Sequence, residues 1–377
     1  MTARVWRNMD WFLAVLTVVA AILGLAVVAG VSGPQFSDAA VQYYLKRQAM
    51  WVVLGCAAFV LFAHIDYHDF LPWRRWLYVL MVGLLATVFV IGHHANGAER
   101  AIDFGPFQLQ PSEPAKLLLV VTLGAMLESR LGQLRRVRDL IVPVLFTILP
   151  VLLVVAQPDL GSSLVLLAIL LVMVFAAGFP GGKLLVLVIL GVGLAVAAVV
   201  AHLRWHVPIP LHTYQLNRLT AFINPKAQAL TNGWQVLQSE MAIGSGRLHG
   251  TGLFSSGVSN QLGLLNEKTT DFVFSSLANM LGFYGGVLAI LLEVAIAFRA
   301  TQYMARAKDA YGGLLAAGVA AMIGFQAFLN IGMTLGILPV TGVPLPFMSY
   351  GGSGTVIDFA AAGLLESIYV RRKVISF

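Results

Sequence analysis

Long apolar runs without a charged residue are the feature that most constrains the fold. Residues 11–31 and 184–201 contain no Asp, Glu, Lys or Arg. About 20 apolar residues in a helix cross the roughly 30 Å hydrocarbon core of a bilayer. A soluble domain carries about 25% charged residues, whereas this chain of 377 residues carries 11% and is 59% hydrophobic. The sequence therefore predicts an integral membrane protein.

The first apolar run is expected to remain in the protein as a membrane span. Arg4 and Arg7 precede it, but no small-residue cleavage site ends the run. Residues 32–34 are typical of a loop, so a retained span fits better than a signal peptide. Cys56 is the only cysteine, which excludes an intramolecular disulfide and a cysteine metal cluster.

The distribution of positive charge indicates topology rather than a nucleic-acid partner. The net charge is +7, but the basic residues fall in short clusters between apolar runs, which is the pattern that orients a polytopic protein. Most of the 24 Lys and Arg lie on the side of the membrane that carries both termini, so both termini are expected in the cytoplasm. We expect an all-α polytopic fold with ten spans, at residues 11–31, 48–63, 76–92, 115–127, 140–156, 160–178, 184–201, 272–298, 312–336 and 354–370.

The polar segments that are more than connectors all fall on the extracytoplasmic side of this topology. The largest is residues 202–271, a loop between spans 7 and 8 of a single membrane domain covering 1–377. Within it, residues 233–243 have apolar positions at helical spacing and predict an amphipathic helix on the membrane surface. The glycine run at 244–252 is expected to bring backbone amides close to an anion.

Asp271 lies where the long loop meets an apolar span. A carboxylate at this position is about as well explained by a structural role as by a catalytic one, because the helix dipole favours acidic residues in the first turn. Glu267 and Lys268 add charge at the same lipid boundary, a setting that suits a general base facing an amphipathic substrate. Lys268 is a candidate substrate-binding residue.

Glu113 and Lys116 form a second group of charges near lipid. If Ser112 is the N-cap of the following helix, they lie on one helical face at positions i and i+3. Charged groups inside a membrane are functional by default, but they also pair with one another. Substrate binding and a local ion pair are both open interpretations.

Four further polar residues are candidates for substrate binding. Arg100 and Arg218 could clamp a diphosphate through charge-assisted hydrogen bonds, or could face solvent and lipid headgroups. Asp159 follows a proline turn and is expected to cap the next helix. Ser349 lies in residues 339–354, whose prolines and glycines exclude a regular helix. Irregular backbone at membrane depth must be buried in protein or line a wet cavity, so this segment is expected to shape a pocket.

These segments together resemble the SEDS family (shape, elongation, division and sporulation) of RodA and FtsW peptidoglycan polymerases. The similarity runs nearly from end to end, and residues 342–346 and the short tails are more similar to RodA than to FtsW. The most specific motifs lie at residues 110–113, 157–161, 243–246, 270–272 and 342–352.

The resemblance implies a membrane glycosyltransferase on the outer face of the bacterial inner membrane. By it, Asp271 deprotonates the acceptor 4-hydroxyl of lipid II, which attacks the donor anomeric carbon and expels undecaprenyl diphosphate with inversion. Lys116, Arg100 and Arg218 are the candidates to offset the leaving-group charge. Whether a divalent cation such as Mg²⁺ or Mn²⁺ assists is left open. The implied partners are a class B penicillin-binding protein and the elongation-complex membrane proteins.

The sequence departs from the family pattern close to Asp271. Asn266 and Thr269 stand where the family usually has proline and histidine, and Asn279 and Met280 stand in place of a usual Glu-Glu. These changes leave the proposed base in place and alter its surroundings.

Two other functions are considered. A lipid II flippase or other transporter suits ten spans with intramembrane charges, but the polar groups gather on one face and no inverted repeat is visible. A non-catalytic scaffold of the elongation machinery would leave Asp271 without a chemical role.

Overall fold

The computed structural model describes residues 6–32, 39–91, 93–95, 98–104, 107–205, 207–208, 213–223, 232–253 and 269–372. Each of the ten predicted runs forms a helix, and the protein is a polytopic α-helical membrane protein. In chain order these helices are α2 (Trp11–Ser32), α3 (Ala39–His64), α4 (Arg74–Ile91), α5 (Ser112–Glu128), α6 (Ile141–Ala156), α7 (Leu160–Ala176), α8 (Gly181–Trp205), α12 (Val273–Arg306), α13 (Ala310–Thr334) and α14 (Gly352–Val370).

Seven of the described helical segments are long and apolar enough to cross a membrane by length and composition. The remaining members of the bundle, α4, α5 and α7, have 18, 17 and 17 residues. The largest extensions at one end of a predicted run are those of α3, which begins at Ala39, and of α12, which continues to Arg306. Their extra turns carry polar residues, which a helix tolerates where it leaves the hydrocarbon, so hydropathy placed these boundaries too far inward.

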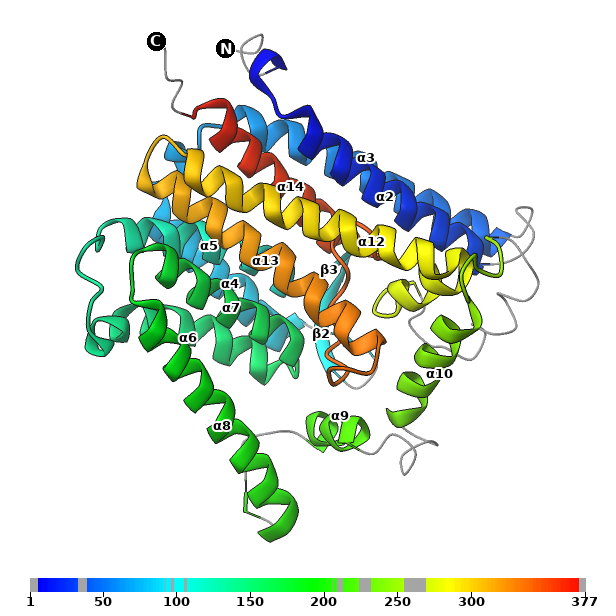
Figure 1. Ribbon diagram of the computed structural model, residues 1–377. Coiled ribbons are helices and arrows are strands. Elements are labelled where there is room, and N and C mark those ends of the chain that lie inside the picture. The colour runs from blue at the N-terminus through cyan, green and yellow to red at the C-terminus, as the bar shows by residue number, and fades with distance from the viewer. Residues whose placement is uncertain are drawn as a thin grey trace.

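Helix α13 lies at the centre of the bundle. It packs against α12, α7, α5 and α14, and 78% of its apolar window is buried inside the protein. A helix enclosed by other helices can carry polar side chains that bond to its neighbours, and α13 buries Gln326 and Asn330. By contrast, Figure 1 shows α8 extending away from the other spans, and none of its apolar window is buried.

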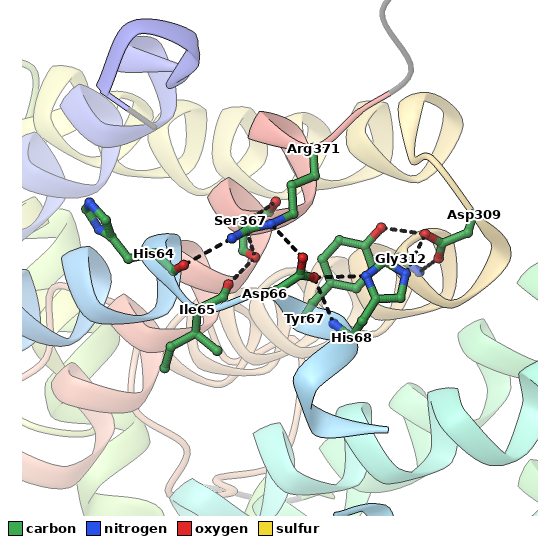
Figure 2. A network of polar contacts seen from close by, with 9 residues as sticks. All are labelled: His64, Ile65, Asp66, Tyr67, His68, Asp309, Gly312, Ser367 and Arg371. Carbon is green, nitrogen blue, oxygen red and sulfur yellow. Dashed lines mark hydrogen bonds and ion pairs between the residues drawn. The ribbon is translucent and has the colours of Figure 1, made fainter. Parts of the chain in front are cut away.

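A polar network fixes the start of α13 to the turn that follows α3 (Figure 2). Asp309 caps α13 by accepting a hydrogen bond from the Gly312 N–H at 2.8 Å. The same carboxylate accepts from the Tyr67 hydroxyl at 2.5 Å and lies 2.9 Å from Nε2 of His68. Tyr67 and His68 belong to the short 3₁₀ helix η1 (Tyr67–Phe70). The network therefore joins elements that are far apart in sequence.

Asp66 extends this network to the end of α14. Its carboxylate lies 3.1 Å from Nε of Arg371 and accepts a hydrogen bond from the His68 N–H at 3.0 Å. Burial raises the pKa of Asp66, but the hydrogen bonds from His68 and the charge of Arg371 hold it below its ordinary value. Close by, Arg372 donates to the Asn8 carbonyl at 3.4 Å. The described beginning and end of the chain therefore lie on the same side of the bundle, as an even number of spans requires.

A small antiparallel sheet lies between α4 and α5, and the sequence analysis did not predict it. Its strands are β1 (His93–Ala95), β2 (Ala98–Phe104) and β3 (Phe107–Leu109), in the order β1-β2-β3. The sheet lies within the polar segment that connects the third and fourth predicted spans. Strands β1 and β3 have three residues each, which is too few for an alternation of apolar and polar residues to be recognised.

The long loop contains two described helices, α9 (Thr213–Ile223) and α10 (Asn232–Ser245). Helix α10 confirms the helix predicted at 233–243. It packs on α12 with Val236, Ser239 and Ala242 buried, while Trp234 and Met241 are exposed. The exposed apolar side is consistent with the expected location at a membrane surface.

The glycine run after α10 packs against a break in α12, which corrects the prediction of an anion site. Gly282 has φ +67 inside α12, and a Cβ at Gly250 would lie 2.0 Å from the Met280 carbonyl oxygen. The amides of Thr251 and Gly252 donate to the carbonyls of Asn279 and Met280 at 3.0 and 3.1 Å. These glycines allow two backbones to approach, and their amides bond to protein.

Candidate active site

Asp271 lies in a turn immediately before α12, and this turn is held at three consecutive carbonyls. The Tyr350 N–H donates to the Thr269 carbonyl at 2.8 Å, and the Ser349 hydroxyl donates to that of Thr270 at 2.7 Å. Nδ2 of Asn330 donates to the Asp271 carbonyl at 2.8 Å. The Asp271 residue is itself half-buried. A fixed backbone at a partly exposed acidic residue is the arrangement that a positioned acid or base requires.

Asn330 joins this turn to the proline-rich segment. Its Nδ2 also donates to the Val343 carbonyl at 2.7 Å, and the side chain is fully buried. Its Oδ1 is buried without a hydrogen-bond partner in the described part of the chain. Two backbone segments that are far apart in sequence are therefore held by one amide from α13.

The segment between α13 and α14 is irregular, as its prolines and glycines predicted, and it is buried in protein. Val343 and Met348 are fully buried, and Leu345 and Phe347 nearly so. The Ser349 hydroxyl accepts from the Leu345 N–H at 2.8 Å in addition to its bond to the Asp271 turn. Ser349 thus holds backbone in this structure, and its role in substrate binding stays a prediction.

Glu113 and Lys116 form the predicted i,i+3 ion pair, with 2.8 Å between Nζ and Oε1. Lys116 is completely buried and Glu113 is 2% exposed. Nζ also donates to Oε1 of Gln326 on α13. Gln326 and Asn330 are one helical turn apart, so they share a face of α13. That face connects the buried ion pair to the Asp271 turn.

The start of α5 differs from the prediction. Pro111 occupies the N-cap position, and Ser112 makes no capping hydrogen bond. The Ser112 hydroxyl instead donates to Asp159 at 3.2 Å, as does Nε2 of Gln110. Asp159 caps α7 as predicted, accepting from the Ser162 N–H at 3.0 Å. Because Asp159 binds both helix starts, it fixes α5 against α7, and its contact with substrate stays a prediction.

The three remaining basic candidates lie in the segments that connect the spans. Arg218 on α9 donates from Nη1 to the Val340 carbonyl at 3.2 Å and is partly exposed, which brings α9 to the proline-rich segment. Arg100 lies in β2, but its side chain lies outside the described atoms. Lys268 and Asn266 lie outside the described residues.

Sequence reasoning missed the buried amides because it followed charged residues. Besides Asn330 and Gln326, Gln48 on α3 is fully buried and donates to the Ser349 carbonyl at 3.2 Å. Asn279, at a position that departs from the family pattern, donates from Nδ2 to the Ala242 carbonyl at 2.9 Å and to the Ser245 hydroxyl at 2.6 Å. An amide in the middle of an apolar span is the signal that could have found them, because it must bond within the protein.

Comparison with known proteins places this arrangement in a family. The model of the FtsW/RodA/SpoVE cell cycle protein family matches residues 9–374. A probable peptidoglycan glycosyltransferase FtsW from a Geobacter species is 35% identical over 339 residues, covering 88% of each chain. The peptidoglycan glycosyltransferase MrdB of Escherichia coli is 32% identical over 332 residues, covering 88% of this chain and 87% of that protein.

The fold agrees with these sequence matches. A chain in a solved structure described as "Structural coordination of polymerization and crosslinking by a peptidoglycan synthase complex" superimposes with a TM-score of 0.78. It is 31% identical, and the alignment covers 96% of this chain and 97% of that one. The chain belongs to the FtsW/RodA/SpoVE family of cell cycle proteins.

Proposed function

We propose that the protein is a peptidoglycan glycosyltransferase that polymerises lipid II, with Asp271 as the general base. The enzyme class follows from the relatives, which are named peptidoglycan glycosyltransferases. The observation that carries the role of Asp271 is the anchoring of carbonyls 269, 270 and 271 by three separate donors. No comparable set of contacts is needed for a residue that only starts a helix.

The reaction needs one proton acceptor and positive charge. Asp271 takes the proton of the acceptor 4-hydroxyl. The oxygen of that hydroxyl bonds to the anomeric carbon of the donor. The bond from that carbon to the diphosphate breaks, and undecaprenyl diphosphate leaves with inversion. General-base assistance of this kind contributes about 10²–10⁴-fold to the rate.

Arg218 is proposed to meet the diphosphate. It is partly exposed at the proline-rich segment, and a guanidinium presents five donors in a planar fork. Arg100 and Lys268 are proposed to assist in the same role. Among the described residues, no group of three or more His, Cys, Asp or Glu side chains could hold a metal ion, so no step here is assigned to Mg²⁺ or Mn²⁺.

The buried Glu113–Lys116 pair is proposed to act on the substrate indirectly, through the electrostatic field of the Lys116 charge and by holding neighbouring helices in place. Lys116 has no exposed surface, so direct contact with a diphosphate would require it to leave Glu113 or Gln326. At its buried depth, its charge is less screened than a charge in water. The pair also fixes α5 against α13, which carries the Asn330 anchor.

The remaining assignments concern location and partners. We propose an inner-membrane protein with cytoplasmic termini and the active site on the extracytoplasmic face, because the polar loops gather there and the basic connectors lie opposite. The proposed partners are a class B penicillin-binding protein and other elongation-complex proteins. A solved relative is described as part of a synthase complex that coordinates polymerization and crosslinking, which supports a transpeptidase partner. An elongation role rests on the RodA-like residues 342–346.

The test is polymerisation of labelled lipid II by the full chain with its transpeptidase partner in detergent, with product length read on a gel. We expect wild type to make long products and Asp271→Asn to lose at least 10²-fold in rate. Asp69→Asn is the matched control, because Asp69 is an exposed aspartate in η1.

The outcomes separate the enzyme from the two other functions. Detergent leaves no membrane to cross, so a flippase or a scaffold would yield no polymer with wild-type protein. Polymerisation by Asp271→Asn at the wild-type rate would contradict the general-base role while leaving the enzyme class intact.

A further inference from the structure

Buried acidic groups outnumber buried cations near the Glu113–Lys116 ion pair. Glu113, Asp358 and Glu293 are 2%, 4% and 2% exposed, and Lys116, at 0%, is the cation that interacts with this group. Glu113 is paired with Lys116 at 2.8 Å. If all three acids were ionised, the group would carry more negative than positive charge in a low-dielectric bundle, which is costly.

Glu293 is the acid that most clearly lacks a group to stabilise its negative charge. It lies on α12, and both of its carboxyl oxygens are buried without a hydrogen-bond partner in the described part of the chain. An ionised carboxylate at membrane depth requires donors or a paired cation. Asp358 is the group that acts on it electrostatically, and that group is also an acid. Nothing described around Glu293 stabilises a negative charge.

The carboxyl group of Asp358, on α14, has only some of the hydrogen-bond partners that it can accept. Its Oδ2 accepts from the Phe347 N–H at 3.2 Å, and the Gln326 side chain also acts on the carboxyl group. Its Oδ1 is buried and without a partner among the described residues. Gln326 uses its Oε1 to accept from Lys116, so its amide N–H₂ is the end that can donate to Asp358. A chain of polar groups thus runs from Lys116 through Gln326 to Asp358, with Glu293 as its neighbour.

We propose that Glu293 and Asp358 form an intramembrane proton-binding site. Bound protons offset the acids that Lys116 does not neutralise, so Glu113–Lys116 stays a simple ion pair. A proton suits the site better than a metal cation, because no group of three or more His, Cys, Asp or Glu side chains in the described parts of the protein could hold a metal ion. The ionisable groups that act on the two carboxyls are each other, Glu113 and Lys116.

The experiment is infrared spectroscopy of the full-length protein at pH 7, read in the carbonyl band of protonated carboxylic acids. We expect wild type to show this band, Glu293→Gln to lose part of it, and Glu293→Gln with Asp358→Asn to lose more. The matched control is Glu240→Gln, because Glu240 is an exposed glutamate on α10; it should leave the band unchanged. Thermal unfolding in sodium chloride and in choline chloride should give the same midpoint for wild type.

Three results would overturn the proposal. One is a band that is unchanged in the double variant. Another is failure of Glu293→Gln to fold, because a neutral group of the same size should replace a protonated glutamate. The third is a wild-type midpoint that rises with sodium, which would assign the site to a cation.

Discussion

Replacing Asn330 by alanine should separate the positioning of Asp271 from the stability of the bundle. The change removes the amide that donates to the Asp271 and Val343 carbonyls at 2.8 and 2.7 Å. Both carbonyls then lose a buried partner, and the turn before α12 is held at two carbonyls instead of three. We expect a modest loss of stability and a larger loss of activity.

The magnitudes follow from the contacts. Leaving a buried polar group unpaired costs about 1–3 kcal/mol, so two carbonyls cost about 2–6 kcal/mol. The substitution also removes Asn330 Oδ1, which is already buried without a partner, and this returns about 1–3 kcal/mol. The net destabilisation is therefore about 1–3 kcal/mol. Misplacement of a catalytic group by about 1 Å can lower the rate about 10²-fold.

The assay measures kcat and KM for lipid II polymerisation, with thermal unfolding of the same preparations. Asn279→Ala is the matched control, because Asn279 is a fully buried asparagine whose Nδ2 also makes two bonds, to Ala242 and Ser245. Asn279→Ala should lose more stability than Asn330→Ala, because the Oδ1 of Asn279 also accepts from the Thr251 hydroxyl at 3.2 Å. Only Asn330→Ala should show a drop in kcat of about 10–100-fold with KM little changed. Equal losses of activity in the two variants would refute the positioning role.

Three further predictions concern stability. Lys116→Met leaves Glu113 buried without its partner and should cost about 3–5 kcal/mol; adding Glu113→Gln should restore most of the thermal midpoint, and a double variant no better than the single would contradict this. Gly250→Ala should lower the midpoint strongly, because its Cβ would meet the Met280 oxygen at 2.0 Å and φ is +82, whereas Gly244→Ala meets open space and should be nearly neutral. Because its pKa is held below the ordinary value of about 3.9, Asp66 stabilises the fold above that value and this contribution is lost as pH falls through the folded pKa. The thermal midpoint of Asp66→Asn should therefore fall less than that of wild type on acidification from about pH 5 to pH 3, and an equal fall would argue against it.

Much of the architecture could be predicted because lipid imposes a local rule. A span must satisfy its backbone hydrogen bonds within itself and present apolar side chains, so all ten runs could be located from hydropathy. The Glu113–Lys116 pair and the cap made by Asp159 were also predictable, since both partners of each contact lie within one helical turn. Asp271 was found as a charge at the edge of a span, although its role could not be derived from that position alone.

The contacts that build the candidate site were not predictable, because they join residues far apart in sequence. Ser112 has the residue type of an N-cap, but a distant carboxylate, Asp159, is its partner. The glycine run has the composition of an anion-binding loop, but the break in α12 takes up its amides. Hydrogen-bond partners of this kind are decided by the packing of helices.

By itself, the sequence determined a helical membrane protein of this family with charges concentrated near the ends of its spans. Only the tertiary structure decided that buried amides on α13 connect the Asp271 turn with the Lys116 ion pair, and that Glu293 and Asp358 lie beside it without enough positive charge. The physical reason is that hydropathy is a property of each segment. The pairing of a buried polar group depends on which other segment is packed against it.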